Sequence, residues 1–167
     1  MSARSKAELP LTASIIVAPA VSGSHILRIV GYSRTKGLGN SKFISSETFA
    51  VGGHRWCLQY YPDSYHLGDS DWICILLHSY HTGVEEVKVN FQISLLDQDG
   101  NPVPSYSIKS PLCSFSSTNG TMGYEVIKRS DLEKSDFLKH DAFSVRCDVT
   151  VAKEIFTKAL PISGLSR

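Results

Sequence analysis

FISSETFAVGGHRWCLQYYPD, residues 43–63, reads as two extended segments joined at a pair of glycines, Gly52 and Gly53. On each side of the pair, apolar and polar side chains alternate with a period of two, which is typical of a β-strand. The pair predicts a hairpin, because glycine adopts the positive φ angles that a tight hairpin turn requires. Trp56 stands on the second segment, and its burial would make that segment a central strand of the core.

The same alternation recurs along the rest of the chain and leaves little room for helix. It predicts strands at residues 25–30, 72–77, 87–95, 112–116, 124–126 and 143–151. The run 72–77 is apolar at every position, so we expect that strand to be covered on both faces. Residues 103–110 are bracketed by prolines and are predicted as loop or edge strand. Many short strands joined by turns predict an all-β fold, an antiparallel β-sandwich.

Two short helical turns are predicted between the strands. Ser33 is the expected N-cap of a turn that Gly37 and Gly39 end. Residues 130–133, Ser-Asp-Leu-Glu, have the capping-box pattern, in which the serine caps the first turn and the glutamate returns the hydrogen bond. They predict a helix of one or two turns.

Length and composition narrow the class of protein. The chain has 167 residues, enough for one domain with a buried core. Its net charge of +1 gives no field that would attract nucleic acid or a membrane surface. No apolar segment of signal-peptide length follows the N-terminus, and the four cysteines are far apart. We therefore expect reduced thiols in a protein of the nucleus, the cytoplasm or both.

A search for catalytic and metal-binding patterns gives no strong candidate. No serine lies in a nucleophile motif such as GxSxG, and the four thiols are expected to be packed as small hydrophobic side chains. His78 and His81 have a spacing that metals use, but third and fourth ligands are not evident. Residues 97–101 resemble a calcium loop without its downstream glutamate. We expect no enzymatic activity, no cofactor and no metal.

The ordered set of motifs resembles the MATH domain, also called the TRAF-C homology domain, of plant MATH-BTB proteins. The likeness is carried by residues 46–64, where Ser64 replaces a common glycine, and by the strand and turn at 25–39. Residues 91–100 and 123–132 resemble the middle and late strands of that family. The resemblance implies a TRAF-like sandwich of about eight strands.

The resemblance also implies the domain boundaries. The MATH domain is expected at residues 22–153. Residues 1–21 are then a flexible N-terminal lead, although 14–17 could add an edge strand. Residues 154–167 are a C-terminal tail or the start of a linker.

The resemblance implies a protein-binding function. MATH domains of MATH-BTB adaptors bind short Ser/Thr-rich degrons in a shallow groove, and the attached BTB domain dimerises and docks on a cullin, so that the bound protein is ubiquitylated. We therefore expect the substrate-recognition domain of a cullin-RING ubiquitin ligase adaptor. No BTB-like segment lies in this sequence, so a cullin is a partner only if a BTB domain is attached.

Two alternatives remain open. The first is a stand-alone MATH protein or a TRAF-like scaffold that binds partner tails without recruiting a ligase. A trimeric scaffold of this kind calls for coiled-coil heptads before the sandwich, and residues 1–22 contain none. The second is the binding module of a MATH-bearing deubiquitinase, but the sequence shows no catalytic Cys/His constellation.

The resemblance places the peptide groove on six residues: Leu76, Phe91, Cys113, Met122, Gly123 and Tyr124. An animal relative has Trp at the position of Met122 and Tyr at those of Cys113 and Leu76, so this groove is expected to prefer a more apolar peptide. The residue pattern leaves a second interpretation open. Phe91 shares its face with other apolar residues of its strand, and Leu76 lies in an apolar run, so both can belong to the core.

Overall fold

The computed structural model describes residues 9–66 and 71–165 of the chain. The chain divides into two compact units, residues 20–152 and a second unit made of the two terminal segments. None of the helices in the described ranges has the length and apolar character needed to cross a membrane.

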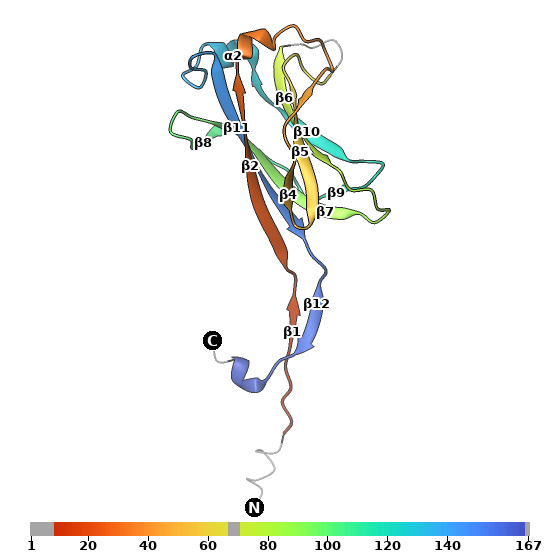
Figure 1. Cartoon of the computed structure of the whole chain (residues 1–167). Coiled ribbons are helices and arrows are strands. Elements are labelled where there is room, and N and C mark those ends of the chain that lie inside the picture. Colours follow the sequence, from red (N-terminus) through yellow and green to blue (C-terminus); the bar gives the residue numbers. More distant parts are fainter. Residues whose placement is uncertain (1–8, 67–70, 166–167) are drawn as a thin grey trace, which may run out of the picture. The chain divides into compact units, whose positions relative to one another are not determined.

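The larger unit is a sandwich of two five-stranded antiparallel sheets (Figure 1). The first sheet has the order β10-β6-β5-β3, with β4 also paired to β5; its strands are β3 Ile44–Ser45, β4 Phe49–Val51, β5 His54–Tyr61, β6 Trp72–Ser79 and β10 Thr121–Lys128. The second has the order β2-β11-β7-β8, with β9 also paired to β7; its strands are β2 Ala20–Val30, β7 Val87–Leu96, β8 Pro102–Lys109, β9 Cys113–Phe115 and β11 Ala142–Ala152. The predicted antiparallel sandwich is confirmed.

The β4–β5 hairpin forms where the glycine pair predicts it. Val51 pairs with His54, and the two glycines between them have φ angles of 64° and 81°. Trp56 on β5 is completely buried, and its indole N–H donates a hydrogen bond to the carbonyl of Val51. The tryptophan therefore closes its own hairpin and packs on the core from a central strand, as expected.

Strand β6 is covered on both faces, as its apolar sequence predicts. Ile73, Ile75 and Leu77 point into the core between the sheets. Cys74 and Leu76 point to the outer face, yet both are buried, because they pack with Tyr61 and Trp72 in a smaller apolar cluster. The outer face of this sheet is therefore partly covered by apolar side chains.

Both predicted serine caps are wrong, although both helical turns exist. The first turn is the 3-10 helix η1, Tyr32–Arg34, whose N-cap is Gly31; the hydroxyl of Ser33 instead donates to Asp141 at 2.6 Å. The second is α2, Arg129–Glu133, which has no side-chain cap and begins directly after β10. Its first N–H donates to the carbonyl of Asp71, and Ser130 lies inside the helix instead of capping it.

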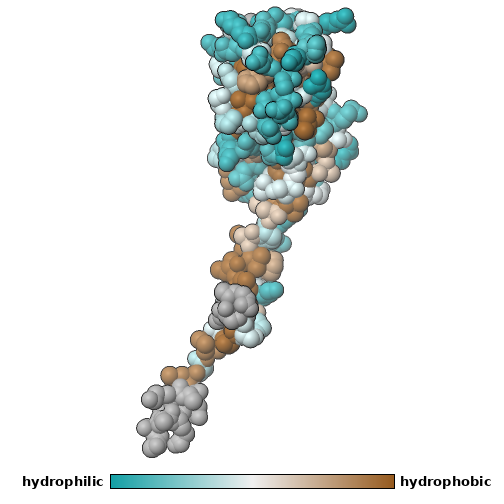
Figure 2. Space-filling view, turned by 90° about the vertical axis from the view of Figure 1, so that its left-hand side faces the viewer, coloured by the Kyte–Doolittle hydropathy of each residue, from teal (hydrophilic) through white to brown (hydrophobic). Residues whose placement is uncertain are grey.

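The smaller unit is an antiparallel pair of strands followed by a short 3-10 helix. β1, Ser14–Val17, pairs with β12, Phe156–Ala159, and η2 covers Ile162–Leu165. The segments expected as a flexible lead and a tail thus contain paired strands. Exposed apolar side chains occur on both strands and beside them: Leu9, Leu11, Ile16, Ile155, Phe156 and Ile162. Figure 2 shows such hydrophobic residues on one face of this unit.

Candidate functional site

The pairing of β10 with β6 divides four of the six predicted groove residues between two faces of the sheet. Met122 and Tyr124 stand opposite Leu77 and Ile75, so their side chains point toward the core. Gly123 stands opposite Leu76, and this pair lies on the outer face. Because side chains alternate along a strand, the residues cannot all line one groove with their side chains.

Four of the six residues meet at the rim of the core, in what we call the edge cluster: Phe91, Cys113, Met122 and Tyr124. The rings of Phe91 and Tyr124 lie 5.8 Å apart between centroids. Burial, with a smaller contribution from the neighbouring Cys113, raises the pKa of the Tyr124 phenol. Phe91 is buried in the core, whereas the other three are only partly buried. The edge cluster is therefore an apolar rim with one phenol.

The Tyr124 hydroxyl makes no hydrogen bond with any residue that the structure describes. The thiol of Cys113 donates to the carbonyl of Pro111 at 3.0 Å, so its S–H donor is already engaged. Tyr124 thus supplies the polar group of the edge cluster that a ligand could meet.

A small hollow lies on the opposite face, and we call it the outer hollow. Its volume is about 230 Å³, and nine residues line it: Tyr65, His66, Cys74, Leu76, Thr121, Met122, Gly123, Tyr124 and Glu125. Cys74 and Leu76 supply an apolar base, while Tyr65, His66 and Glu125 supply polar walls. The side chains of Met122 and Tyr124 point to the other face, so these two residues line the outer hollow with their backbone atoms.

Gly123 is required by the close packing of β10 on β6. A Cβ at this position would clash with the carbonyl oxygen of Ile75 and would lie 2.8 Å from the Cγ of Leu76. Any side chain would push the two strands apart. Because Gly123 has no side chain, space remains above Leu76, and the glycine thereby keeps the outer hollow open.

Sequence reasoning did not find Tyr65, His66 and Glu125. Glu125 shares the period-two face of Gly123 and could have been placed beside it. Tyr65 and His66 follow Pro62 and Asp63 in a loop, where no periodicity applies. Their position depends on contacts with a distant part of the chain.

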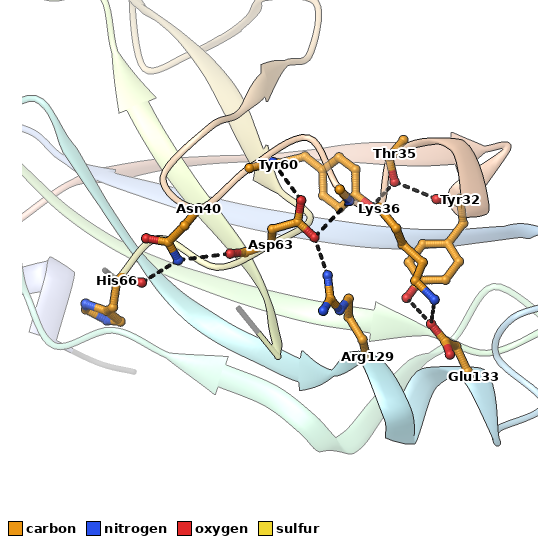
Figure 3. Close-up of polar contacts among 11 residues, drawn as sticks. Tyr32, Thr35, Lys36, Asn40, Tyr60, Asp63, His66, Arg129 and Glu133 are labelled. Carbon is orange, nitrogen blue, oxygen red and sulfur yellow. Dashed lines mark hydrogen bonds and ion pairs between the residues drawn. The ribbon is translucent and has the colours of Figure 1, made fainter. Parts of the chain in front are cut away.

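Those contacts centre on Asp63, which is buried at the end of β5. Its carboxylate forms an ion pair with Arg129 and accepts hydrogen bonds from the N–H groups of Gly37 and Gly39 (Figure 3). Three parts of the chain are thereby tied together: the end of β5, the loop after η1, and α2. The buried charge is compensated, as burial of a carboxylate requires.

The loop after η1 also forms hydrogen bonds with the loop that contains Tyr65 and His66, two wall residues of the outer hollow. The side-chain amide of Asn40 donates to the carbonyls of Asp63 and His66 at 3.1 and 2.6 Å. The hydroxyl of Ser41 donates to the carbonyl of Tyr65 at 2.8 Å. Together these three hydrogen bonds fix the backbone of the loop, so Tyr65 and His66 have defined positions beside the outer hollow.

A second polar group extends the network toward α2. Glu133 accepts hydrogen bonds from Lys36 and from the hydroxyl of Tyr32, both at 2.7 Å, and these bonds lower the pKa of the Glu133 carboxyl (Figure 3). Tyr60 shares a hydrogen bond with Thr35 at 2.8 Å, and burial raises its pKa to about 12. These hydrogen bonds hold η1, the loop after it, β5 and α2 together.

Within the described ranges, no group of three His, Cys, Asp or Glu side chains is placed to hold a metal ion. His78 Nδ1 lies 2.7 Å from the hydroxyl of Thr121, and His81 Nε2 lies 2.8 Å from the carbonyl of Glu85. The two histidines that have metal-like spacing are thus engaged with separate partners. None of the four cysteines, all of which lie in the described ranges, forms a disulfide.

Comparison with known proteins agrees with this architecture. The model of the MATH domain family matches residues 24–149. Two Arabidopsis thaliana relatives are the BTB/POZ and MATH domain-containing proteins 4 and 3. Protein 4 is 35% identical over 149 residues, which are 85% of this chain and 32% of that protein. Protein 3 is 32% identical over 152 residues, which are 87% of this chain and 37% of that protein. The chain therefore spans about a third of the length of these relatives.

Among solved structures, TRAF5 of Notothenia coriiceps has the same fold, with a TM-score of 0.55 over 87% of this chain and 77% of that one. The sequence identity is 16%, so this likeness bears on the fold alone.

Proposed function

The chain belongs to the MATH domain family, and from this premise we propose that it recognises a protein partner by binding an extended segment along β10. The supporting observation is the position of β10. It ends the strand order of its sheet and pairs with β6 alone among the described strands. Its second edge can therefore accept the main-chain hydrogen bonds of an added strand.

The edge cluster supports this choice of surface. Met122 and Tyr124 belong to β10 itself, and Phe91 and Cys113 lie across the rim on the opposite sheet. A segment bound along β10 would place alternate side chains against these groups. Recognition of this kind obtains affinity from the backbone and sequence choice from small pockets.

The chemistry of the edge cluster favours an apolar ligand side chain. Met122 and Cys113 offer polarizable apolar surface, and Tyr124 offers a phenol. The hydroxyl of Tyr124 would bind a serine or threonine hydroxyl of a Ser/Thr-rich segment. Met122 and Cys113 would contact an apolar side chain next to that residue in the bound segment. We propose binding and no catalytic step.

We further propose that the natural role is substrate recognition for a cullin-RING ubiquitin ligase, through a BTB domain in the complete protein. The names of the Arabidopsis relatives mention both a BTB/POZ and a MATH domain, and this supports the proposal. The alternative is a MATH protein that binds its partner without a ligase. Co-purification of a cullin with the natural full-length product distinguishes the two, since only the adaptor is expected to bind a cullin.

Binding along β10 is tested with a peptide array on the purified chain. Tyr124→Ala and Met122→Ala are each expected to weaken the selected peptides about tenfold, the usual effect of removing a central contact. Ile26→Ala is the control, because Ile26 is an exposed apolar residue on β2 of the other sheet. Equal binding by the parent chain and both β10 variants would reject this surface.

A further inference from the structure

Glu125 is an acidic side chain in the polar wall of the outer hollow. It lies on β10 opposite Cys74 and is partly buried. Its carboxylate makes no hydrogen bond or ion pair with any residue that the structure describes. Two other acids of the larger unit differ: Asp63 is paired with Arg129, and Glu133 with Lys36.

The two cationic residues that follow Glu125 in the sequence, Lys128 and Arg129, are held by other partners. The ammonium of Lys128 lies 5.7 Å from the centre of the Trp72 ring, further along the same pair of strands. Arg129 is committed to Asp63. Among the residues that the structure describes, no lysine, arginine or histidine forms an ion pair with Glu125.

The dimensions of the outer hollow suit one side chain. Its volume of about 230 Å³ lies below the range of roughly 300–1,000 Å³ that small-molecule sites occupy. An arginine or lysine has an apolar stem and a cationic head, so the stem would lie on Leu76 while the head reaches Glu125. Tyr65, which is 46% exposed, would offer a ring face to the same cation.

We propose that the outer hollow binds a cationic side chain, arginine or lysine, of the protein partner. This inference rests on the proposed function, since it adds a charged subsite on the outer face of the strand that binds the partner. Glu125 supplies the charge, Leu76 the apolar contact, and Gly123 the space. A partner of the domain would then carry a basic residue beside its apolar and hydroxyl-bearing ones.

The test uses two probes that differ only in charge. N-acetyl-arginine methylamide and its neutral citrulline counterpart are titrated into the isotope-labelled chain, and the amide resonances of His66, Gly123 and Glu125 are followed by NMR. The arginine probe is expected to shift these resonances with an affinity at least about fivefold higher than citrulline. Glu125→Gln should remove that difference. Glu47→Gln, which removes an exposed carboxylate beyond the outer hollow, should preserve it.

Equal binding of the two probes, or an unchanged charge preference in Glu125→Gln, would overturn the inference. The peptide array separates this failure from failure of the proposed function. Peptides that bind through Tyr124 without enrichment of basic residues would leave the function standing and reject the subsite. Glu125-dependent binding of the arginine probe in a chain that selects no peptide would support the subsite and reject the function.

Discussion

Asp63 shows how a single residue connects the fold to the candidate site. Its carboxylate is buried and compensated by Arg129 and by two backbone N–H groups of the loop after η1. That loop also carries Asn40, which fixes the backbone of His66 beside the outer hollow. A substitution of Arg129 is therefore expected to affect the position of His66 beside the outer hollow, although Arg129 does not line the hollow.

We predict that Arg129→Met lowers the free energy of unfolding by about 3 kcal/mol, because it leaves the Asp63 carboxylate buried without its countercharge. The measurement is chemical denaturation at neutral pH. Lys88→Met is the control: it breaks an ion pair with Glu86 in which both side chains are more than half exposed, together with a hydrogen bond to the hydroxyl of Ser114, and the loss of stability should be clearly smaller. Equal losses in the two variants would show that the Arg129 pair contributes no more than a surface pair.

At the scale of the elements, the β4–β5 hairpin is held by its turn and by its packing on β11. Gly52 has a φ of 64°, and a Cβ there would lie 2.7 Å from the Cβ of Val151. Gly100, in the β7–β8 turn, has a φ of 82°, and a Cβ added there would meet no atom within 4 Å. The two glycines share a backbone requirement and differ in the space around them.

We predict that Gly100→Ala costs about 1–2 kcal/mol, the strain of an L-residue in the left-handed region. Gly52→Ala should cost at least about 3 kcal/mol, since the clash with Val151 adds an overpacking cost to the same strain. Thermal or chemical unfolding of the two variants measures the difference. If the two losses were the same, β11 would be free to move away from the turn at negligible cost.

The elements that are predictable from the sequence are those that local patterns determine. The glycine pair at 52–53 specifies a hairpin turn and the alternation along β7 specifies a strand, and both are confirmed. The caps predicted at Ser33 and Ser130 are wrong because residues distant in the sequence bond to these turns: the hydroxyl of Ser33 donates to Asp141, and the carbonyl of Asp71 accepts the first N–H of α2.

The candidate site is less predictable than the fold for the same reason. Adjacent positions such as Gly123 and Tyr124 must face opposite sides of a strand, and period-two alternation alone requires this. The position of Tyr65 and His66 depends instead on hydrogen bonds from residues 40–41, which are distant in the sequence. No local pattern encodes such a contact. The assignment of the groove residues stays a prediction for the peptide experiment.

At the scale of the whole molecule, the two units differ in how their strands are supported. β11 pairs with β2 on one side and β7 on the other, and its inward side chains are completely or almost completely buried. β1 and β12 pair with each other alone among the described strands, and β12 is exposed at every position. A two-stranded pair without a covered face is marginally stable in water.

We therefore predict that the backbone amides of β1 and β12 exchange with solvent at least about a thousandfold faster than those of β7 and β11, because opening a local pair needs far less free energy than unfolding a sandwich. Hydrogen exchange followed by NMR or mass spectrometry measures this at neutral pH. The fragment 20–152 is the matched control, and its β7 and β11 amides should keep the protection they have in the whole chain. Slow exchange in β1 and β12 would contradict the prediction, and would mean that something covers the apolar side chains of Ile16 and Phe156 in solution.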